Sequence, residues 1–244
     1  MSKTFVVLTL LVSAVVLADT QRKTDARSLF YDTTSDLTKA PGALEHKEGA
    51  GTAKAAAAAA KPISTGLMYY VELIQPGGEK IRVTTKRVFH SGDKLRLHVE
   101  TKVDGRLVVL QRRRDGSAQV LFPDPRVHNG DNLIRAHVDT VVPSDESWFK
   151  FDDKPGLEKL TLLLATEAKY GDFRQEVAEA RADSDRAVKL EAKIHKATQR
   201  DLIVEVDDDK EKAGTFVIEK TAAGGPDPNP ASGMVTAEIT LNHQ

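Results

Sequence analysis

Residues 94–110 read KLRLHVETKVDGRLVVL, and this stretch decides the fold. Its first half alternates, with Leu95, Leu97 and Val99 on one side and polar side chains on the other. A period of two is typical of a β-strand that has one dry face and one wet face. We therefore expect a strand here, with His98 as an ordinary surface histidine on the wet face.

The residues that follow predict a meander. Asp104-Gly105 tolerates positive φ angles and predicts a tight hairpin turn. The apolar run Leu107–Leu110 is typical of a strand buried on both faces. Asp115-Gly116 gives a second turn, and Val120–Phe122 begins a third strand. We expect the rest of the domain to be built around this unit.

Composition sets the outer bounds. The chain has 244 residues, enough for one large or two small domains. Its 35 basic and 36 acidic residues nearly cancel, so no overall field attracts nucleic acid, and we expect no nucleic-acid partner. Cysteine is absent, which excludes disulfides, thiol nucleophiles and cysteine-ligated metals.

The N-terminus predicts a secretory signal peptide over residues 1–18. Lys3 is followed by an apolar run to Leu17, and Val16-Leu17-Ala18 suits signal peptidase. The alternative is an uncleaved anchor. The mature chain then begins near Asp19, without a later membrane-spanning helix, and we expect it to be exported to the periplasm or the extracellular space.

Residues 19–62 predict a disordered linker. Gly49–Lys61 consists almost wholly of Gly, Ala, Thr and Lys, and it offers no large side chain to bury. One apolar island, Leu29-Phe30-Tyr31, interrupts the polar composition. We interpret it as part of a solvated tail, with docking on the domain or on a partner as the alternative.

Residues 63–244 predict a single domain of short strands separated by turns, with one helical segment. The segment at about 172–198 is charged and Ala-rich, which favours helix, and Asp183-Ser184-Asp185 marks a break within it. The predicted fold class is all-β, an immunoglobulin-like β-sandwich with a helical insertion and a disordered N-terminal tail. We expect the last strand, Val235–Leu241, to pair near the first, Leu67–Ile74.

Several ordered motifs resemble the bacterial domain-of-unknown-function family 4384. They are Val88-Phe89-His90-Ser91-Gly92-Asp93, Asp104-Gly105, Asp115-Gly116, Leu121-Phe122-Pro123, Trp148-Phe149-Lys150-Phe151 and Pro155-Gly156-Leu157-Glu158. The resemblance covers roughly Leu67 to Glu167. Two positions depart from the family pattern: Arg106 stands where an aromatic residue is frequent, and Arg135-Ala136-His137 where an alanine-glycine pair is usual. The resemblance implies an all-β domain of exported or multidomain bacterial proteins, with no established chemistry.

No motif for catalysis or cofactor binding is present. The chain lacks His-Glu-x-x-His, the Gly-x-Ser-x-Gly elbow and a phosphate-binding glycine loop. We therefore expect no catalytic residue, no cofactor, no metal site and no enzyme activity. The acidic turn Asp207–Asp209 suits a hard cation in residue type, and a solvated turn is the alternative.

Two groups of residues are candidates for partner contact: Arg112, Arg113 and Arg114 at a hairpin tip, and the aromatic residues Trp148, Phe149 and Phe151. A solvated strand face and core filling are the respective alternatives. The predicted function is a secreted, non-catalytic module that binds or scaffolds in the bacterial cell envelope, with an envelope protein or glycan as partner. The alternatives are a structural subunit of an envelope assembly and an uncharacterised enzyme.

Overall fold

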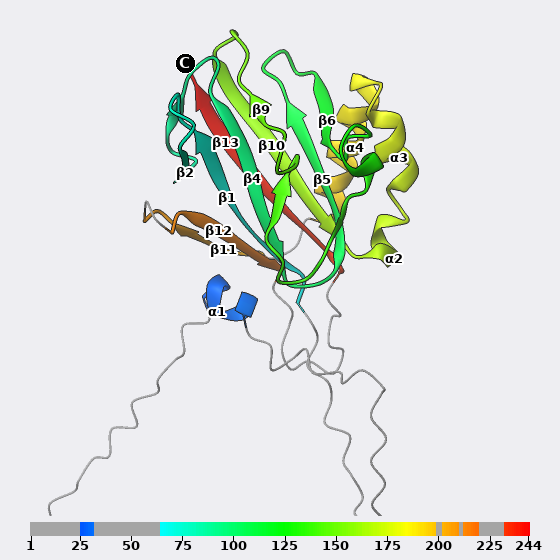
Figure 1. Ribbon diagram of the computed structural model, residues 1–244. Coiled ribbons are helices and arrows are strands. Elements are labelled where there is room, and N and C mark those ends of the chain that lie inside the picture. Colours follow the sequence, from blue (N-terminus) through cyan, green and yellow to red (C-terminus); the bar gives the residue numbers. More distant parts are fainter. Residues whose placement is uncertain (1–24, 32–63, 199–201, 210–211, 220–231) are drawn as a thin grey trace, which may run out of the picture.

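Two β-sheets packed face to face form the body of the protein, and helices cover parts of their outer faces (Figure 1). In this computed structural model the described residues are 25–31, 64–198, 202–209, 212–219 and 232–244. The prediction of a mostly β, sandwich-like protein is confirmed. The predicted signal peptide and most of the predicted linker lie outside the described residues.

The first sheet, sheet A, has the strand order β11-β12-β1-β4-β8, with β2 beside β1 and β9 beside β4. Its strands are β1 (Gly66–Ile74), β2 (Lys80–Val83), β4 (Lys94–Thr101), β8 (Thr140–Val142), β9 (Phe149–Lys150), β11 (Leu202–Asp207) and β12 (Gly214–Glu219). The second, sheet B, has the order β3-β13-β10-β5-β6, with β7 beside β5. Its strands are β3 (Val88–Phe89), β5 (Gly105–Arg112), β6 (Ala118–Phe122), β7 (Leu133–Ile134), β10 (Gly156–Ala165) and β13 (Met234–His243).

The core between the sheets contains the residues that the sequence placed on the dry face. Leu97 of β4 and Val109 of β5 are both fully buried in it. In β5, Val109 faces this core whereas Val108 and Leu110 face the helices on the other side. The prediction of a strand buried on both faces is therefore confirmed for β5.

The predicted hairpin at Asp104-Gly105 is wrong, because β4 and β5 do not pair. They belong to different sheets, so the chain crosses here from sheet A to sheet B. Gly105 is required for close packing: a Cβ atom on it would lie 2.7 Å from Leu164 Cδ1 and 2.8 Å from the Ala165 carbonyl oxygen. A turn residue and a close-approach glycine look the same in a sequence.

The expected pairing of the last strand with the first is also wrong. β13 lies between β3 and β10. It is parallel to β3 and antiparallel to β10, with Gly156 opposite His243 at one end and Ala165 opposite Met234 at the other. Both edges of β1 are already occupied, by β4 along one side and by β12 and β2 along the other. The first and last strands still share one core, from opposite sheets.

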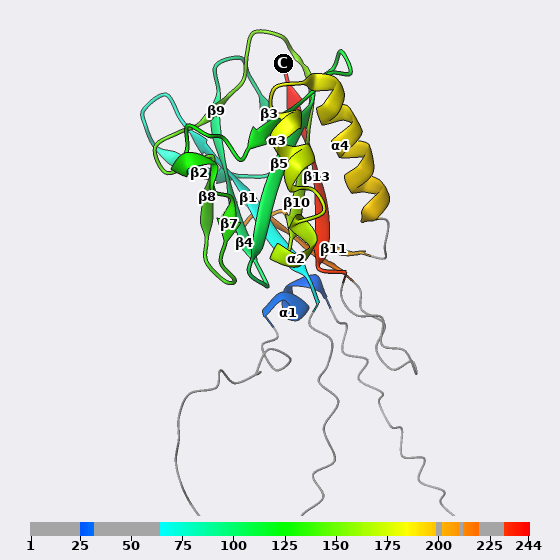
Figure 2. The same cartoon turned by 90° about the vertical axis from the view of Figure 1, so that its right-hand side faces the viewer.

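Helices α2 (Glu167–Tyr170), α3 (Arg174–Ala180) and α4 (Ser184–Ala197) pack on the outer face of sheet B (Figure 2). These helices have few apolar residues, but those few are enough to hold them on the sheet, because Val177, Leu190 and Ile194 pack against the outward side chains of β5 and β10. The predicted break near Asp183 is confirmed, since its carboxylate caps α4 by accepting from the amides of Asp185 and Arg186. None of the helices among the described residues is long and apolar enough to cross a membrane.

Residues 25–31 correct the interpretation of a solvated tail. Ala26–Tyr31 form helix α1, and Phe30 is 0% exposed against Phe216 and Ile218 of β12. The residues of the predicted disordered linker that the structure describes are therefore docked on sheet A. The outer face of sheet A carries apolar side chains, and the alternation in the sequence does not tell which segment covers them.

Candidate functional site

The predicted arginines meet at one end of the sandwich, around a hollow of about 500 Å³. We call it the basic hollow, and its lining residues are Arg112, Arg113, Arg114, Gly156, Leu157, Lys159 and Asn242. Four of these side chains are cationic and none is acidic. Lys159 lies directly opposite Arg112 in the pairing of β10 with β5, so like charges adjoin across the strands. Guanidinium groups bind carboxylate, phosphate or sulfate oxygens through paired N–H donors, which is the chemistry this hollow offers.

The three arginines have different roles. The Arg112 Nε donates to Glu191 Oε2 of α4 at 2.7 Å, and the Thr161 hydroxyl donates to the other carboxylate oxygen at 3.1 Å. Glu191 is only 6% exposed, so Arg112 holds α4 onto sheet B. Arg113 and Arg114 are exposed, and Arg114 has no hydrogen bond or ion pair with any described residue. These two arginines and Lys159 are therefore the accessible cations.

A larger hollow of about 970 Å³ lies next to the basic hollow and shares Arg113 and Arg114 with it. It also contains Lys150 and Lys154, and its carboxylates are those of Asp115, Asp152 and Glu158. Mixed charge makes this second surface polar without a net preference for anions. Of these two hollows, only the basic hollow has a lining without carboxylates.

The predicted aromatic cluster is not an exposed group. Phe151 belongs to the core, where its ring lies 5.1 Å from Phe89 and 4.8 Å from His243 between ring centroids. Phe149 is half-buried and packs against the same core. Core filling, the stated alternative, therefore describes both phenylalanines, and none of the three aromatic residues lines the basic hollow.

Trp148 is half-buried and covers a charged side chain. The Arg96 guanidinium lies 3.5 Å from its ring centroid, within the range of a cation–π contact. Arg96 also donates to the carbonyl oxygen of Ser147 at 3.1 Å and to that of Asp145. Trp148 and Arg96 together fix the loop before β9 on the outer face of sheet A.

His98 is not the surface histidine that the alternation predicted, since it is only 9% exposed. Its Nδ1 atom lies 2.9 Å from Asp139 Oδ2, its Nε2 atom lies 3.5 Å from Glu72 Oε2, and its ring stacks on Tyr70 with centroids 4.3 Å apart. The loops that follow β7 and β8 cover this face of sheet A, so its polar side chains are enclosed. We call Tyr70, Glu72, Arg96, His98 and Asp139 the polar cluster.

Two groups of the polar cluster have shifted pKa values. Burial, with the nearby Asp139 carboxylate, raises the pKa of Tyr70 to about 12. For Asp139, partial burial acts to raise the pKa, but hydrogen bonds from His98 and Tyr70 and the attraction of His98 and Arg82 outweigh it, so the pKa lies below the ordinary 3.8. Asp139 therefore carries its negative charge under all ordinary conditions and ties the loop before β8 to the sheet.

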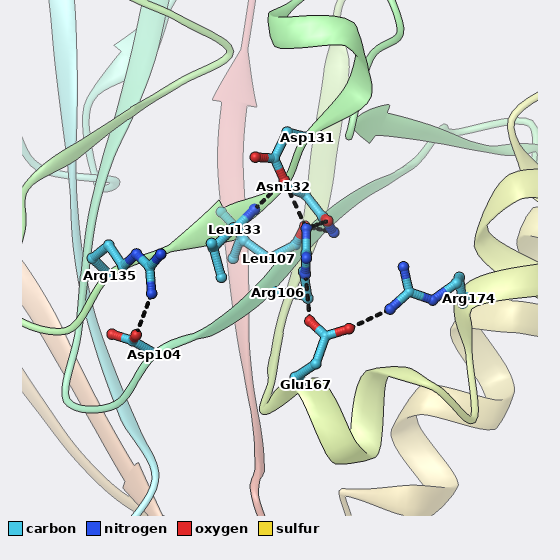
Figure 3. A network of polar contacts seen from close by, with 9 residues as sticks. All are labelled: Asp104, Arg106, Leu107, Asp131, Asn132, Leu133, Arg135, Glu167 and Arg174. Atoms are coloured by element: carbon cyan, nitrogen blue, oxygen red, sulfur yellow. Dashed lines mark hydrogen bonds and ion pairs between the residues drawn. The ribbon is translucent and has the colours of Figure 1, made fainter.

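Arg106, a departure from the family pattern, forms a bridge between three segments (Figure 3). Its Nη1 atom lies 2.6 Å from Asp131 Oδ1, and its Nε donates to Glu167 Oε2 at 2.7 Å. Glu167 also pairs with Arg174 of α3. The second departure, His137, has a φ of 57°, the left-handed region that favours glycine. Arg106 therefore has a structural role, whereas the φ of residue 137 explains why glycine suits the position and leaves the histidine without a structural explanation.

The acidic turn Asp207–Asp209 is engaged by basic side chains. Asp207 Oδ2 lies 2.7 Å from the Arg27 guanidinium, and Asp208 pairs with Lys86. No group of carboxylates and histidines arranged for a metal ion occurs among the described residues. A cation at this turn would have to displace these ion pairs.

Sequence reasoning missed Lys159 and the whole polar cluster. Lys159 lies directly after the quoted motif that ends in Glu158, so its proximity to the turn was visible. Its position opposite Arg112 was not visible, because it depends on the register of β10 and β5. The period of two places Tyr70 and Glu72 on one face of β1, but only the pairing with β4 brings them to His98.

The fold and these surfaces define a class: a β-sandwich module with covering helices and a cationic hollow at one end. Residues 88–168, from β3 into α2, match the family described as Domain of unknown function (DUF4384). The family predicted from the motifs is confirmed, over a shorter range than Leu67 to Glu167. No curated protein and no solved structure matches the chain.

Replacing Arg112 by Ala is expected to lower the free energy of unfolding by about 1–3 kcal/mol, because buried Glu191 loses its charged donor. Arg114→Ala, the matched control at an exposed neighbour, is expected to change it by less than about 0.5 kcal/mol. Urea unfolding of the two variants measures the difference. Equal stability of both would show that the Arg112 contact with α4 does not hold the helix.

Asp139→Asn is expected to be less stable than the wild type at pH 7 by about 0.2–1 kcal/mol, a small effect since the Asp139 side chain is 47% exposed. A carboxyl with a lowered folded-state pKa stabilises the protein above its unfolded pKa and loses this contribution as pH falls through the folded value. The stability difference should therefore vanish as pH falls well below 3.8. Thermal unfolding of both proteins between about pH 2.5 and about pH 7 measures this stability difference. Asp153→Asn, at an exposed carboxylate, is the control and should show no such trend.

Proposed function

We propose that the protein is an exported, non-catalytic binding module of the bacterial cell envelope, and that the basic hollow binds an acidic group of its partner. The observation that carries this proposal is the composition of the hollow. It has four cationic lining residues, no carboxylate, and a volume of about 500 Å³. A hollow of this size accommodates a sugar acid, a phosphate ester or an acidic side chain of an envelope glycan or protein.

The use of polar groups elsewhere supports binding over catalysis. An enzyme needs space for substrate beside its acid–base groups. The polar cluster contains a histidine and two carboxylates, but the hollow that touches Tyr70 measures only about 10 Å³, room for about one water molecule. Its groups are directed at each other and at loop carbonyls, which supports a role in holding loops on sheet A.

Export rests on the sequence of residues 1–18, which reads as a secretory signal with a basic start, an apolar run and small residues at its end. The absence of cysteine agrees with a domain held by its core alone. Residues 1–18 lie outside the described residues, so the proposal of export draws only on their sequence.

We propose the immunoglobulin-like version of the sandwich as its finer class. In the immunoglobulin fold, one sheet contains strands C, F and G, and β5, β10 and β13 correspond to these three strands. Strand β6 follows β5 at the edge of the same sheet. Strands β1, β4 and β8 correspond to the opposite sheet. On this view the segment with α2, α3, α4 and the β11–β12 hairpin is an insertion before the last strand.

The combined substitution of Arg113, Arg114 and Lys159 by Ala is expected to reduce binding to isolated cell envelopes of the parent organism at least fivefold. The three side chains are the accessible cations of the basic hollow. Co-sedimentation of the purified mature chain with the envelopes, over a range of salt concentrations, measures the effect. Weaker binding at high salt is expected for an ionic contact.

The matched control is Lys169→Ala with Lys189→Ala and Lys196→Ala, which removes the same charge from the exposed helical side of the protein. This variant is expected to bind like the wild type. Equal loss in both triple variants would mean that net charge alone governs binding. Unchanged binding of the first variant would rule out the basic hollow as the contact site.

A second candidate function, a structural subunit of an envelope assembly, is favoured by the edge strand β11. Val204 and Val206 of β11 are 56% and 52% exposed, side by side on one face of the strand. β11 is the last strand of sheet A in the described part of the chain, and only β12 pairs with it. An exposed edge with apolar side chains is a template for pairing with another strand.

Under this second function, Val204→Lys with Val206→Lys is expected to convert stable oligomers of the mature chain to monomers, because charged side chains on an edge strand oppose pairing. Multi-angle light scattering after size-exclusion chromatography measures the mass. Val138→Lys, at another exposed valine, is the control. A monomeric wild type would exclude assembly through β11.

A further inference from the structure

Helix α1 is a short peptide that occupies an apolar groove on the outer face of sheet A. The groove is formed by the outward side chains of Met68, Ile203, Phe216 and Ile218, and we call it the α1 groove. Phe30 is its central occupant and is fully buried. The ring of Phe30 meets the ring of Phe216 edge to face at 5.7 Å between centroids. Aromatic pairs in this geometry contribute beyond the area they bury.

Charged and polar contacts fix both ends of α1 in the groove. At its start, the Arg27 amide donates to Glu205 Oε2 at 3.0 Å, and the Arg27 guanidinium donates to Asp207 Oδ2 at 2.7 Å. At its end, the Lys102 ammonium donates to the carbonyl oxygen of Leu29 at 2.7 Å. An acidic group near the first turn and a cation at the last carbonyls both suit the helix dipole. The groove therefore selects the direction in which the peptide lies as well as the apolar side that it buries.

One further residue, His137, contacts the peptide. His137 holds a φ of 57°, in the left-handed region that residues with a side chain rarely adopt. Its ring lies 5.8 Å from the ring of Phe30 between centroids. The loop before β8 therefore also contributes a ring contact to Phe30.

The connection between α1 and the sandwich is long. Residues 32–63 separate Tyr31 from the first described residue of the sandwich, Ser64. A chain of this length spans up to about 110 Å when extended. No disulfide ties α1 to the groove, since the chain has no cysteine. The α1 that occupies a groove can therefore belong to the same chain as the groove or to another chain.

We propose that the α1 groove is a docking site for the segment Asp25–Tyr31 of a second copy as well as its own, so that two chains link by exchanging α1. The exchanged and unexchanged forms have the same contacts, so concentration decides between them. Covalent tethers give effective concentrations on the order of 1 mM or below. Exchange then becomes prominent where the chain is concentrated, as in an assembly. This proposal is independent of the basic hollow, which lies toward the opposite end of the sandwich, near the C-terminal end of β13 (Figure 1).

The test uses the full mature chain and a labelled peptide of residues 22–34. Phe30→Ala in the protein empties its own groove, so this variant is expected to bind the peptide at least tenfold more tightly than the wild type does, by fluorescence anisotropy. A peptide with Phe30→Ala is the control and should not bind. Arg27→Glu in the protein is a second variant, chosen because Arg27 is only partly buried and touches the groove through its ion pair. It too should bind the wild-type peptide more tightly.

Sedimentation equilibrium at about 10 μM and about 1 mM tests the exchange itself. The wild type is expected to be monomeric at the lower concentration and partly dimeric at the higher, and both variants should stay monomeric at both. Absence of peptide binding to both variants, provided that circular dichroism shows them folded, would overturn the docking site. A monomeric wild type at the higher concentration, or dimers that persist in the variants, would overturn exchange between copies.

Discussion

The close approach of Gly105 to Ala165 is the constraint on which the architecture depends. Asp104 and Gly105 carry the chain from one sheet to the other, and Gly105 begins β5 against the end of β10 with no room for a side chain. This contact sets the position of β5 between β10 and β6. The position of β5 in turn decides that Val109 faces the inner core while Val108 and Leu110 receive the helices. The two layers of apolar packing follow from one crossing point.

A second principle governs the outer face of sheet A, where burial is achieved by covering segments. β4 and the residue that follows it carry three side chains, Arg96, His98 and Lys102, that would be exposed in an isolated sheet. Loop carbonyls, Asp139 and α1 cover them: Arg96 donates to loop carbonyls, His98 Nδ1 pairs with Asp139 and its ring stacks on Tyr70, and Lys102 donates to Leu29. Buried charges are tolerated only when they are paired in this way. The face is therefore a platform for short segments, of which α1 is one.

Much of the fold could be predicted from the sequence because local pattern decides it. The alternation in β4, the apolar run in β5 and the cap at Asp183 each depend on residues within a few positions. The errors have a common physical cause, which is pairing between distant segments. Whether Asp104-Gly105 turns back or crosses over, and whether β13 joins β1 or β10, depends on partners that no local pattern names. The same holds for the candidate site. The arginines could be predicted because they form a run in the sequence. The place of Lys159 depends on the register of β10 with β5, and the burial of Phe151 depends on the packing of the core.

The place of β13 in the middle of sheet B has a consequence for how the protein acquires its structure. Residues 234–243 insert between β3 and β10, so until this segment has left the ribosome β10 is paired only with β5, and β3 is not joined to the sheet. Pairings between distant parts of a chain are slow to form. The strand that completes sheet B is therefore the last one to become available to it.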